Sequence, residues 1–131
     1  MNDMLPKLFF VHFRETSFVA ISKEEIVGFL IGFLSQTFPD QAYIHFVGIH
    51  PDFRKRGLAS NLYEHFMSVA RKKGCRVVRC ITSPVNKGSI AYHTRIGFTI
   101  EPGDIEVDGF SVAKGYDGQG GDRVLFVKSL R

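Results

Sequence analysis

One stretch, residues 47–59, constrains this chain more than any other. It reads VGIHPDFRKRGLA and joins an apolar strand, predicted over residues 42–49, to a basic loop and then to a helix that begins at Gly57. The first amides of a helix have no partner within it and carry partial positive charge, so such a loop can hold a phosphate. Arg54 and Arg56 add full charges, and Gly57 lets the backbone approach a bulky anion. The stretch therefore predicts a diphosphate site.

Strands and helices are predicted on both sides of this stretch. Two strands over residues 18–21 and 26–34, joined by a polar turn, indicate an antiparallel hairpin. Apolar residues spaced by four predict an amphipathic helix over residues 57–73, which Gly74 ends. A strand over residues 75–82 follows, so the strand, crossover helix and strand imply a parallel pair. Ligands bind beyond the carboxyl ends of such strands.

The two ends of the chain are less regular. Residues 4–13 are apolar on several sides and fit either a helix or an extended cover for the sheet. A second helix is predicted over residues 86–96, and two closing strands over residues 98–100 and 123–129. Between those strands, the Gly- and Asp-rich residues 102–122 indicate a long loop or a loop with a short strand.

Composition limits the class of protein. With 131 residues, 44% of them hydrophobic, the chain is expected to form a single domain over residues 1–131 with a real core. It has no apolar run of transmembrane length and no signal-peptide pattern at its start, so we expect no membrane association and a cytoplasmic location. Cys75 and Cys80 are expected to be free thiols.

The net charge of +4 raises the question of nucleic-acid binding. The excess lies in two runs, residues 54–56 and residues 71–73. The second run ends a helix, where cations are favourable without any ligand. Only the first run therefore needs a ligand, and nucleic acid is not the expected partner.

Two motifs resemble those of the GCN5-related N-acetyltransferase (GNAT) superfamily. Residues 54–59, RKRGLA, resemble its acetyl-CoA pyrophosphate loop, and residues 86–98, NKGSIAYHTRIGF, are close to the N-x-x-S-I-x-x-H-x-x-x-G-F form of its small-molecule acetyltransferases. With the preceding strand, the match covers residues 17–100. The resemblance implies an α/β (α+β) fold with a mixed, mostly antiparallel central sheet and flanking helices. A parallel pair of strands would splay apart at the acetyl-CoA cleft.

The resemblance also assigns contacts to acetyl-CoA, the implied cosubstrate. Amides of residues 56–60 and the Arg54 side chain would wrap the diphosphate, while the backbone of residues 47–49 would pair with the pantetheine arm. Gly48 is the expected place for the bulge that splays the strands. The expected cofactor-binding residues are Val47, Gly48, Ile49, Arg54, Lys55, Arg56, Gly57, Leu58, Ala59, Ser60, Asn86 and Ser89.

Acetyl transfer to an amine needs a group that accepts a proton, and an acid for the departing thiolate helps. Histidine can serve as either at neutral pH. His45, in mid-strand and expected on the same face as Ile49, is the candidate base, although a buried structural histidine is an equal alternative. No pair of histidines has the spacing of a metal site, so no metal is expected.

The family's usual acid is a tyrosine four places before the Gly of Gly-Phe. Here that place holds His93, and Tyr92 stands one residue earlier. Either His93 takes over as the acid, or it packs beside the cofactor and solvent protonates the thiolate. Since one residue turns a helix by about 100°, Tyr92 and His93 cannot face one ligand equally, and His93 is favoured as the residue that faces the cofactor.

The acceptor side is less defined. Family members usually place a strand and two helices before the hairpin, whereas only about sixteen residues precede it here, so we expect a shortened N-terminus. The acceptor wall would then be built differently, borrowed from the partner in a homodimer, or absent. Five acidic residues could attract a cationic amine or simply be solvated: Asp104, Glu106, Asp108, Asp117 and Asp122.

Three functions compete. The leading one is an acetyl-CoA-dependent N-acetyltransferase that acts on the primary amine of a small molecule or peptide. Transfer would be direct, in a ternary complex, since nothing near Cys80 would make it a nucleophile. The alternative is a non-catalytic acyl-CoA-binding or regulatory module with the same fold. A nucleic-acid-binding module is third, because the sheet shows no obvious run of exposed aromatic residues for stacking bases.

Overall fold

The computed structural model describes residues 7–131. The helices are α1 (Lys7–His12), the short 3₁₀ helix η2 (Pro51–Phe53), α2 (Leu58–Lys72) and α3 (Lys87–Arg95). The strands are β1 (Ser17–Ser22), β2 (Glu25–Leu34), β3 (Gln41–Ile49), β4 (Val77–Thr82), β5 (Thr99–Ile100), β6 (Ile105–Val107), β7 (Phe110–Val112) and β8 (Val124–Ser129). The main sheet has the order β1-β2-β3-β4-β8-β5, and β6 and β7 form a second sheet.

The predicted fold class is confirmed. The main sheet is mostly antiparallel, its one parallel pair is β3 and β4, and helices flank it. Its elements cluster into two compact units, Met1–Val78 with Leu130–Arg131, and Arg79–Ser129. The single domain expected from chain length stays a prediction.

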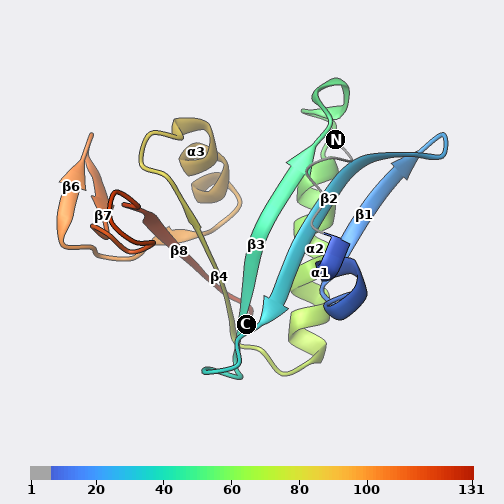
Figure 1. The fold of residues 1–131 in the computed structure, drawn as a ribbon, viewed down its shortest axis with the longest axis horizontal. Coiled ribbons are helices and arrows are strands. Elements are labelled where there is room, and N and C mark those ends of the chain that lie inside the picture. Colours follow the sequence, from blue (N-terminus) through green and yellow to red (C-terminus); the bar gives the residue numbers. More distant parts are fainter. Residues whose placement is uncertain (1–6) are drawn as a thin grey trace. The chain divides into compact units, whose positions relative to one another are not determined.

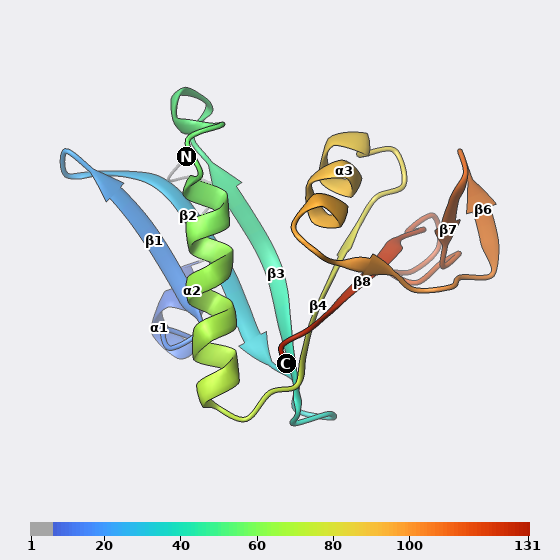
Figure 2. The same ribbon diagram turned by 180° about the vertical axis from the view of Figure 1, so that it is seen from behind.

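An antiparallel hairpin, β1 and β2, begins the first unit as predicted. Lys23 and Glu24 form its tight turn with φ of 50° and 67°, the left-handed conformation that suits the twist of a hairpin. Helix α2 lies on one face of β1, β2 and β3, and α1 lies on the other (Figures 1 and 2). Gly32 lets α2 approach closely, because a Cβ there would come within 2.3 Å of the Phe66 ring. This is the close approach that a glycine in a strand indicates.

The bulge in β3 lies at His45 and not at Gly48. Ile31 pairs with Phe46 and Gly32 pairs with Ile44, which leaves His45 as an extra residue between them. The bulge predicted at Gly48 is therefore wrong, because Gly48 pairs regularly with Phe29. A glycine is required at position 48 for another reason, because a Cβ there would lie 2.6 Å from the ring of the fully buried Phe29.

The extra residue places His45 and Ile49 on opposite faces of the sheet. Ile49 faces α2, because a Cβ at Gly28 would meet both Ile49 and Leu58 of α2. His45 faces α1, where its ring stacks on Phe9 with centroids 5.3 Å apart. The expectation that His45 and Ile49 share a face is therefore wrong, since strict alternation does not hold across a bulge.

In the second unit, α3 packs its buried residues Ile90 and His93 against a small core that includes Phe98 and Phe126. Strands β5 and β8 pair antiparallel. Residues 102–122 are more ordered than the predicted loop with at most one short strand. They contain the hairpin of β6 and β7 and a bridge between Ala113 and Arg123.

Three smaller expectations can also be compared with the structure. Residues 7–12 of the ambiguous apolar segment form helix α1, while residues 4–6 lie outside the described part. Cys75 precedes β4 and does not belong to it, and both cysteines are buried free thiols as expected. Among residues 7–131, no helix combines the length and the apolar character that crossing a membrane requires.

Candidate active site

The loop between β3 and α2 leads directly into the first turn of α2. Its first part is fixed by His50, whose Nδ1 accepts a hydrogen bond from the Asp52 amide at 3.1 Å. Lys55 and Gly57 then adopt left-handed conformations, with φ of 64° and 75°. Gly57 is the N-cap of α2 and, because it has no side chain, it makes no capping hydrogen bond. The positive end of α2 is therefore left without an internal anion.

Three consecutive cations surround this helix start. Arg54, Lys55 and Arg56 are exposed, and no carboxylate within residues 7–131 forms an ion pair with them. The Arg56 guanidinium lies 5.0 Å from the centroid of the Phe53 ring, which orients it. The first turn of α2 also contains no acidic residue. This combination suits an anionic ligand, as the sequence predicted.

Gly57 has the freedom that the predicted role requires. Its φ of 75° is strained for any residue with a Cβ, and a Cβ built there would meet nothing within 4 Å. The space beside Gly57 is therefore open. A side chain at this position would occupy the place where a ligand could approach the helix amides.

The hydrogen-bond pattern of β3 separates the three residues predicted to bind pantetheine. The His50 amide donates to the Val27 carbonyl at 2.7 Å, and opposed pairs alternate along an antiparallel ladder. Gly48 therefore directs its N–H and C=O toward β2. Val47 and Ile49 direct theirs toward the other edge of β3, so only these two could pair with an extended ligand there.

His45 belongs to an aromatic surface on the α1 face of the hairpin. It is exposed, so the alternative of a buried structural histidine is not what the structure shows. Besides the contact with Phe9, this surface contains three ring pairs: Phe33 with Tyr43 at 5.4 Å, Phe13 with Phe33 at 6.3 Å, and Phe29 with Phe46 at 5.5 Å. Phe46 follows His45 on the same face because of the bulge. Periodicity could not reveal this surface, since it assigns neighbouring strand residues to opposite faces.

In the second unit, α3 begins with a side-chain cap. The Asn86 Oδ1 accepts a hydrogen bond from the Ser89 amide at 3.1 Å, so the side-chain oxygen of Asn86 serves as the N-cap of α3. Ser89 in turn contacts His93, whose Nδ1 lies 2.8 Å from the Ser89 carbonyl and 3.2 Å from the Ser89 Oγ. Since a carbonyl only accepts, Nδ1 carries a proton and donates it.

The surroundings of His93 favour its neutral form. The ring is stacked on Phe126 at 4.7 Å and meets the edge of Phe98 at 5.3 Å. Burial lowers the pKa of His93 below its ordinary value, and the hydrogen bond to the Ser89 backbone opposes this only in part. With its proton held on Nδ1, a neutral His93 is a poor proton donor to a thiolate.

Tyr92 and His93 leave α3 in different directions, because one residue turns a helix by about 100°. The planes of their rings meet at 84° with centroids 5.7 Å apart, and the Arg95 guanidinium lies 5.4 Å from the centroid of the Tyr92 ring. Tyr92 is also less buried than His93. The identity of the acid stays a prediction, and the burial of His93 favours a packing role for that residue.

The acidic residues after β5 mostly stabilise their own segment. Four of the five candidates have partners: Asp104 with the Lys114 amide, Asp108 with Lys87, Asp117 with Arg123, and Asp122 with the Gly115 amide. Among the described residues, Glu106 is the exception. These contacts order the β6–β7 region. No ion pair among the described residues neutralises Asp104, Glu106 or Asp122, so the attraction of a cationic amine stays a prediction.

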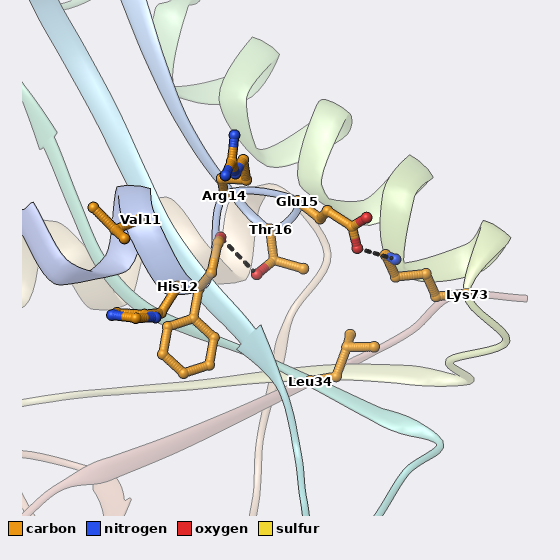
Figure 3. Close-up of a pocket in the computed structure, with 8 residues that line it drawn as sticks. Val11, His12, Arg14, Glu15, Thr16, Leu34 and Lys73 are labelled. Atoms are coloured by element: carbon orange, nitrogen blue, oxygen red, sulfur yellow. Dashed lines mark hydrogen bonds and ion pairs between the residues drawn. The ribbon is translucent and has the colours of Figure 1, made fainter.

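One pocket of the first unit lies away from the loop. It has a volume of about 600 Å³ and lies beside Lys73, one residue after the end of α2, which is roughly 22 Å from the start of that helix. Figure 3 shows the ion pair between Glu15 and Lys73 and the hydrogen bond from Thr16 to the Phe13 carbonyl at this pocket. None of the predicted site residues lines it.

Two further findings concern the chemistry. Burial raises the pKa of the Cys80 thiol, so this cysteine is a weak nucleophile. Within the described part of the chain, no three His, Cys, Asp or Glu residues lie together as a metal site would require.

Residues 2–98 match the family model described as acetyltransferase (GNAT) family, and the chain belongs to this family. An uncharacterized N-acetyltransferase of Methanocaldococcus jannaschii is 39% identical over 57 residues, which are 44% of this chain and 25% of that protein. The L-2,4-diaminobutyric acid acetyltransferase of Halalkalibacterium halodurans is 29% identical over 85 residues, which are 65% of this chain and 45% of that protein. The chain thus spans between a quarter and about half of these curated relatives.

Solved structures show the same fold. Ard1 of Thermoplasma volcanium has a TM-score of 0.76 and 20% identity, with 94% of this chain and 76% of that chain covered. Naa50 of Arabidopsis thaliana, solved with the bisubstrate analogue CoA-Ac-MVNAL, has a TM-score of 0.72 and 18% identity, with 98% and 86% covered. At these identities the likeness establishes the fold alone.

Proposed function

We propose that this chain is an acetyl-CoA-dependent N-acetyltransferase. One observation carries the proposal: in a chain of the GNAT family, the uncapped start of α2 meets three exposed cations and an open left-handed Gly57. A helix start of this kind suits a diphosphate, whose oxygens can accept hydrogen bonds from the helix amides and whose negative charge can pair with the cations. The residues of the loop, 54–60, are the proposed diphosphate site.

The rest of the cofactor is assigned to two further groups of residues. Val47 and Ile49 offer backbone groups at the edge of β3 for the pantetheine arm, whereas Gly48 pairs with Phe29 in β2 and leaves room for the Phe29 ring. Asn86 and Ser89 are proposed cofactor contacts on the strength of the family motif. The Asn86 side-chain amide nitrogen is the group left for this, because its oxygen caps α3.

His45 is the proposed base. It is exposed, it stands at the bulge of β3, and its contact with Phe9 orients the ring. In direct transfer the amine nitrogen forms a bond to the thioester carbonyl carbon while the carbon–sulfur bond breaks. The amine proton passes to His45, directly or through water, and the thiolate takes a proton from Tyr92 or from solvent.

The proposed acceptor is a primary amine of a small molecule or peptide that carries an apolar group. Around His45 the α1 face of the hairpin is aromatic, and Phe46 beside it is 37% exposed. The ring pairs that form this surface contain no carboxylate. A polyamine would find little charge complementarity here, whereas an apolar substituent could be desolvated.

A non-catalytic acyl-CoA-binding module remains the competing function. The observation that favours it is the burial of His93, because this residue stands at the place of the family's usual acid and its lowered pKa makes it a poor proton donor. Such a module would bind the coenzyme through the same loop and would transfer nothing.

Two measurements distinguish the acetyltransferase from a nucleic-acid-binding module and from a non-catalytic acyl-CoA-binding module. Thermal stability is first measured with acetyl-CoA and, separately, with mixed-sequence DNA. An acetyltransferase gives saturable stabilisation by acetyl-CoA, whereas a nucleic-acid-binding module gives salt-sensitive stabilisation by DNA instead.

Free-thiol release is then followed with matched amines. 2-Phenylethylamine and a Met-initiated peptide represent apolar acceptors, and spermidine and a Lys-initiated peptide represent cationic ones. Release with the first pair supports the proposal, and release only with the second overturns the acceptor class. Coenzyme binding without release from any amine favours the non-catalytic module.

A further inference from the structure

Strand β1 is an open edge of the main sheet. It is the first strand in the sheet order, and β2 is its partner among the strands of residues 7–131. Its sequence, SFVAIS, has no charge and no proline, and Val19 and Ile21 are 39% and 64% exposed. Monomeric proteins usually protect such an edge with charged residues, proline or a covering segment. Strand β1 contains neither a charged residue nor a proline.

We propose that a second copy of this chain pairs with β1, antiparallel, and makes the sheet continuous across a two-fold axis. The two ends of β1 differ in charge: Arg14, Glu15 and the Lys73 that pairs with Glu15 give the start +1, whereas Lys23, Glu24 and Glu25 give the end −1. An antiparallel copy brings the start of one β1 to the end of the other, so opposite charges meet at both ends. A parallel copy would bring like charges together.

The proposed two-fold axis passes through the middle of β1. Val19 lies there and faces its own counterpart. Phe18 faces α2, where its ring meets His65 at 4.3 Å, and Val19 and Ile21 therefore face the other side of the sheet. Pairing joins these two exposed side chains with the same two from the second copy into one apolar strip, which favours association.

Glu15 is available for this contact although it already pairs with Lys73. Its carboxylate lies 2.7 Å from the Lys73 Nζ, and its side chain is still 75% exposed. The interface therefore extends a sheet edge by strand addition and leaves the loop before α2 untouched. The proposed dimer does not depend on acetyltransferase activity, so its test is independent of the test of the proposed function.

The test uses sedimentation equilibrium of the whole chain over a concentration series. The wild type is expected to show a concentration-dependent dimer. Ile21→Lys should weaken it at least about tenfold, because the two-fold axis doubles the introduced charge beside the apolar strip. The control is Val85→Lys, since Val85 is 78% exposed and lies in the second unit. Circular dichroism melts establish that both variants fold.

A cysteine at the axis tests the register. Val19→Cys should form a disulfide-linked dimer on mild oxidation, because paired residues across strands are within disulfide reach. Ile21→Cys should link more slowly, and the wild type, whose cysteines are buried, should not link at all. A wild type that stays monomeric, a dimer indifferent to Ile21→Lys, or equal linking by both cysteine variants would overturn the proposal.

Discussion

The ring of His45 stacks on the ring of Phe9, with centroids 5.3 Å apart and 24° between their planes. This contact joins α1 to β3 at the bulge, where His45 has no opposite partner in β2. A side chain at a bulge is free of the regular alternation and can be aimed at a ligand. The contact therefore orients the proposed base on the face that carries the aromatic surface.

The first prediction concerns His45 as the base. His45→Ala should lower kcat for amine acetylation about 100-fold, because proton acceptance is lost, and should leave the Kd for acetyl-CoA within about twofold. Steady-state kinetics and calorimetry measure the two quantities. His12→Ala, which removes another exposed histidine, is the matched control. An unchanged kcat would mean that another group accepts the proton.

The second prediction concerns acceptor binding by Phe46. Phe46→Ala should raise KM for 2-phenylethylamine about fivefold, equivalent to about 1 kcal/mol of lost apolar contact, with kcat little changed. Phe38→Ala is the control, because Phe38 is also exposed, at 56%, but lies in the turn between β2 and β3. Equal effects of the two substitutions would show that the aromatic surface does not receive the acceptor.

The third prediction concerns the pH dependence of stability from His93. Its pKa is lowered in the native state, so below the ordinary value of 6.5 the unfolded chain binds a proton that the native chain does not. Its contribution is complete above pH 6.5 and is lost as the pH falls toward the native pKa. Between pH 7.5 and 5.5 the free energy of unfolding should drop by up to about 1.4 kcal/mol more in the wild type than in His93→Gln.

Urea denaturation at the two pH values measures this difference. His12→Gln removes an exposed histidine and should retain the wild-type dependence. If His93→Gln retained it as well, His93 would not be held neutral by its surroundings.

The fourth prediction contrasts two glycines. Gly48→Ala should destabilise the chain by about 1–3 kcal/mol, since its Cβ would overlap the buried Phe29 ring. Gly88→Ala should stabilise it by about 0.5–1 kcal/mol, because Gly88 lies in α3 and its Cβ would meet only the Asn86 Oδ1, at 3.8 Å. Thermal and urea denaturation provide both values. A Gly48→Ala variant at least as stable as the wild type would contradict the packing described for Gly48.

Much of the fold was readable from local pattern. The periodic spacing of apolar residues predicted the bounds of helix α2 and of the hairpin of β1 and β2 within a residue or two. The ends of these elements could be predicted because a cap such as Gly57 and a turn such as Lys23-Glu24 depend on the local sequence. The loop of residues 54–57 was likewise predicted with its helix start and its open glycine. Those features depend on neighbours in sequence.

What was missed depends on contacts between distant residues. The bulge at His45 follows from the register with β2, and its phase shift placed Phe46 beside His45. Gly48 was read as a bulge because nothing local reveals the Phe29 ring above it. The burial of His93 follows from its stacking on Phe126, 33 positions later in the sequence, while its position facing the cofactor stays a prediction. No short-range period contains such information.

Binding of acetyl-CoA to the loop before α2 is the central claim, and isothermal titration calorimetry of Gly57→Glu against Gly109→Glu tests it most directly. Both glycines have left-handed φ, 75° and 86°, and at both a Cβ would meet nothing within 4 Å, so strain and added charge are matched. Gly57→Glu should weaken acetyl-CoA binding at least about 100-fold, through bulk and repulsion of the diphosphate, while Gly109→Glu retains wild-type affinity. Wild-type affinity in a folded Gly57→Glu variant would show that the diphosphate binds elsewhere.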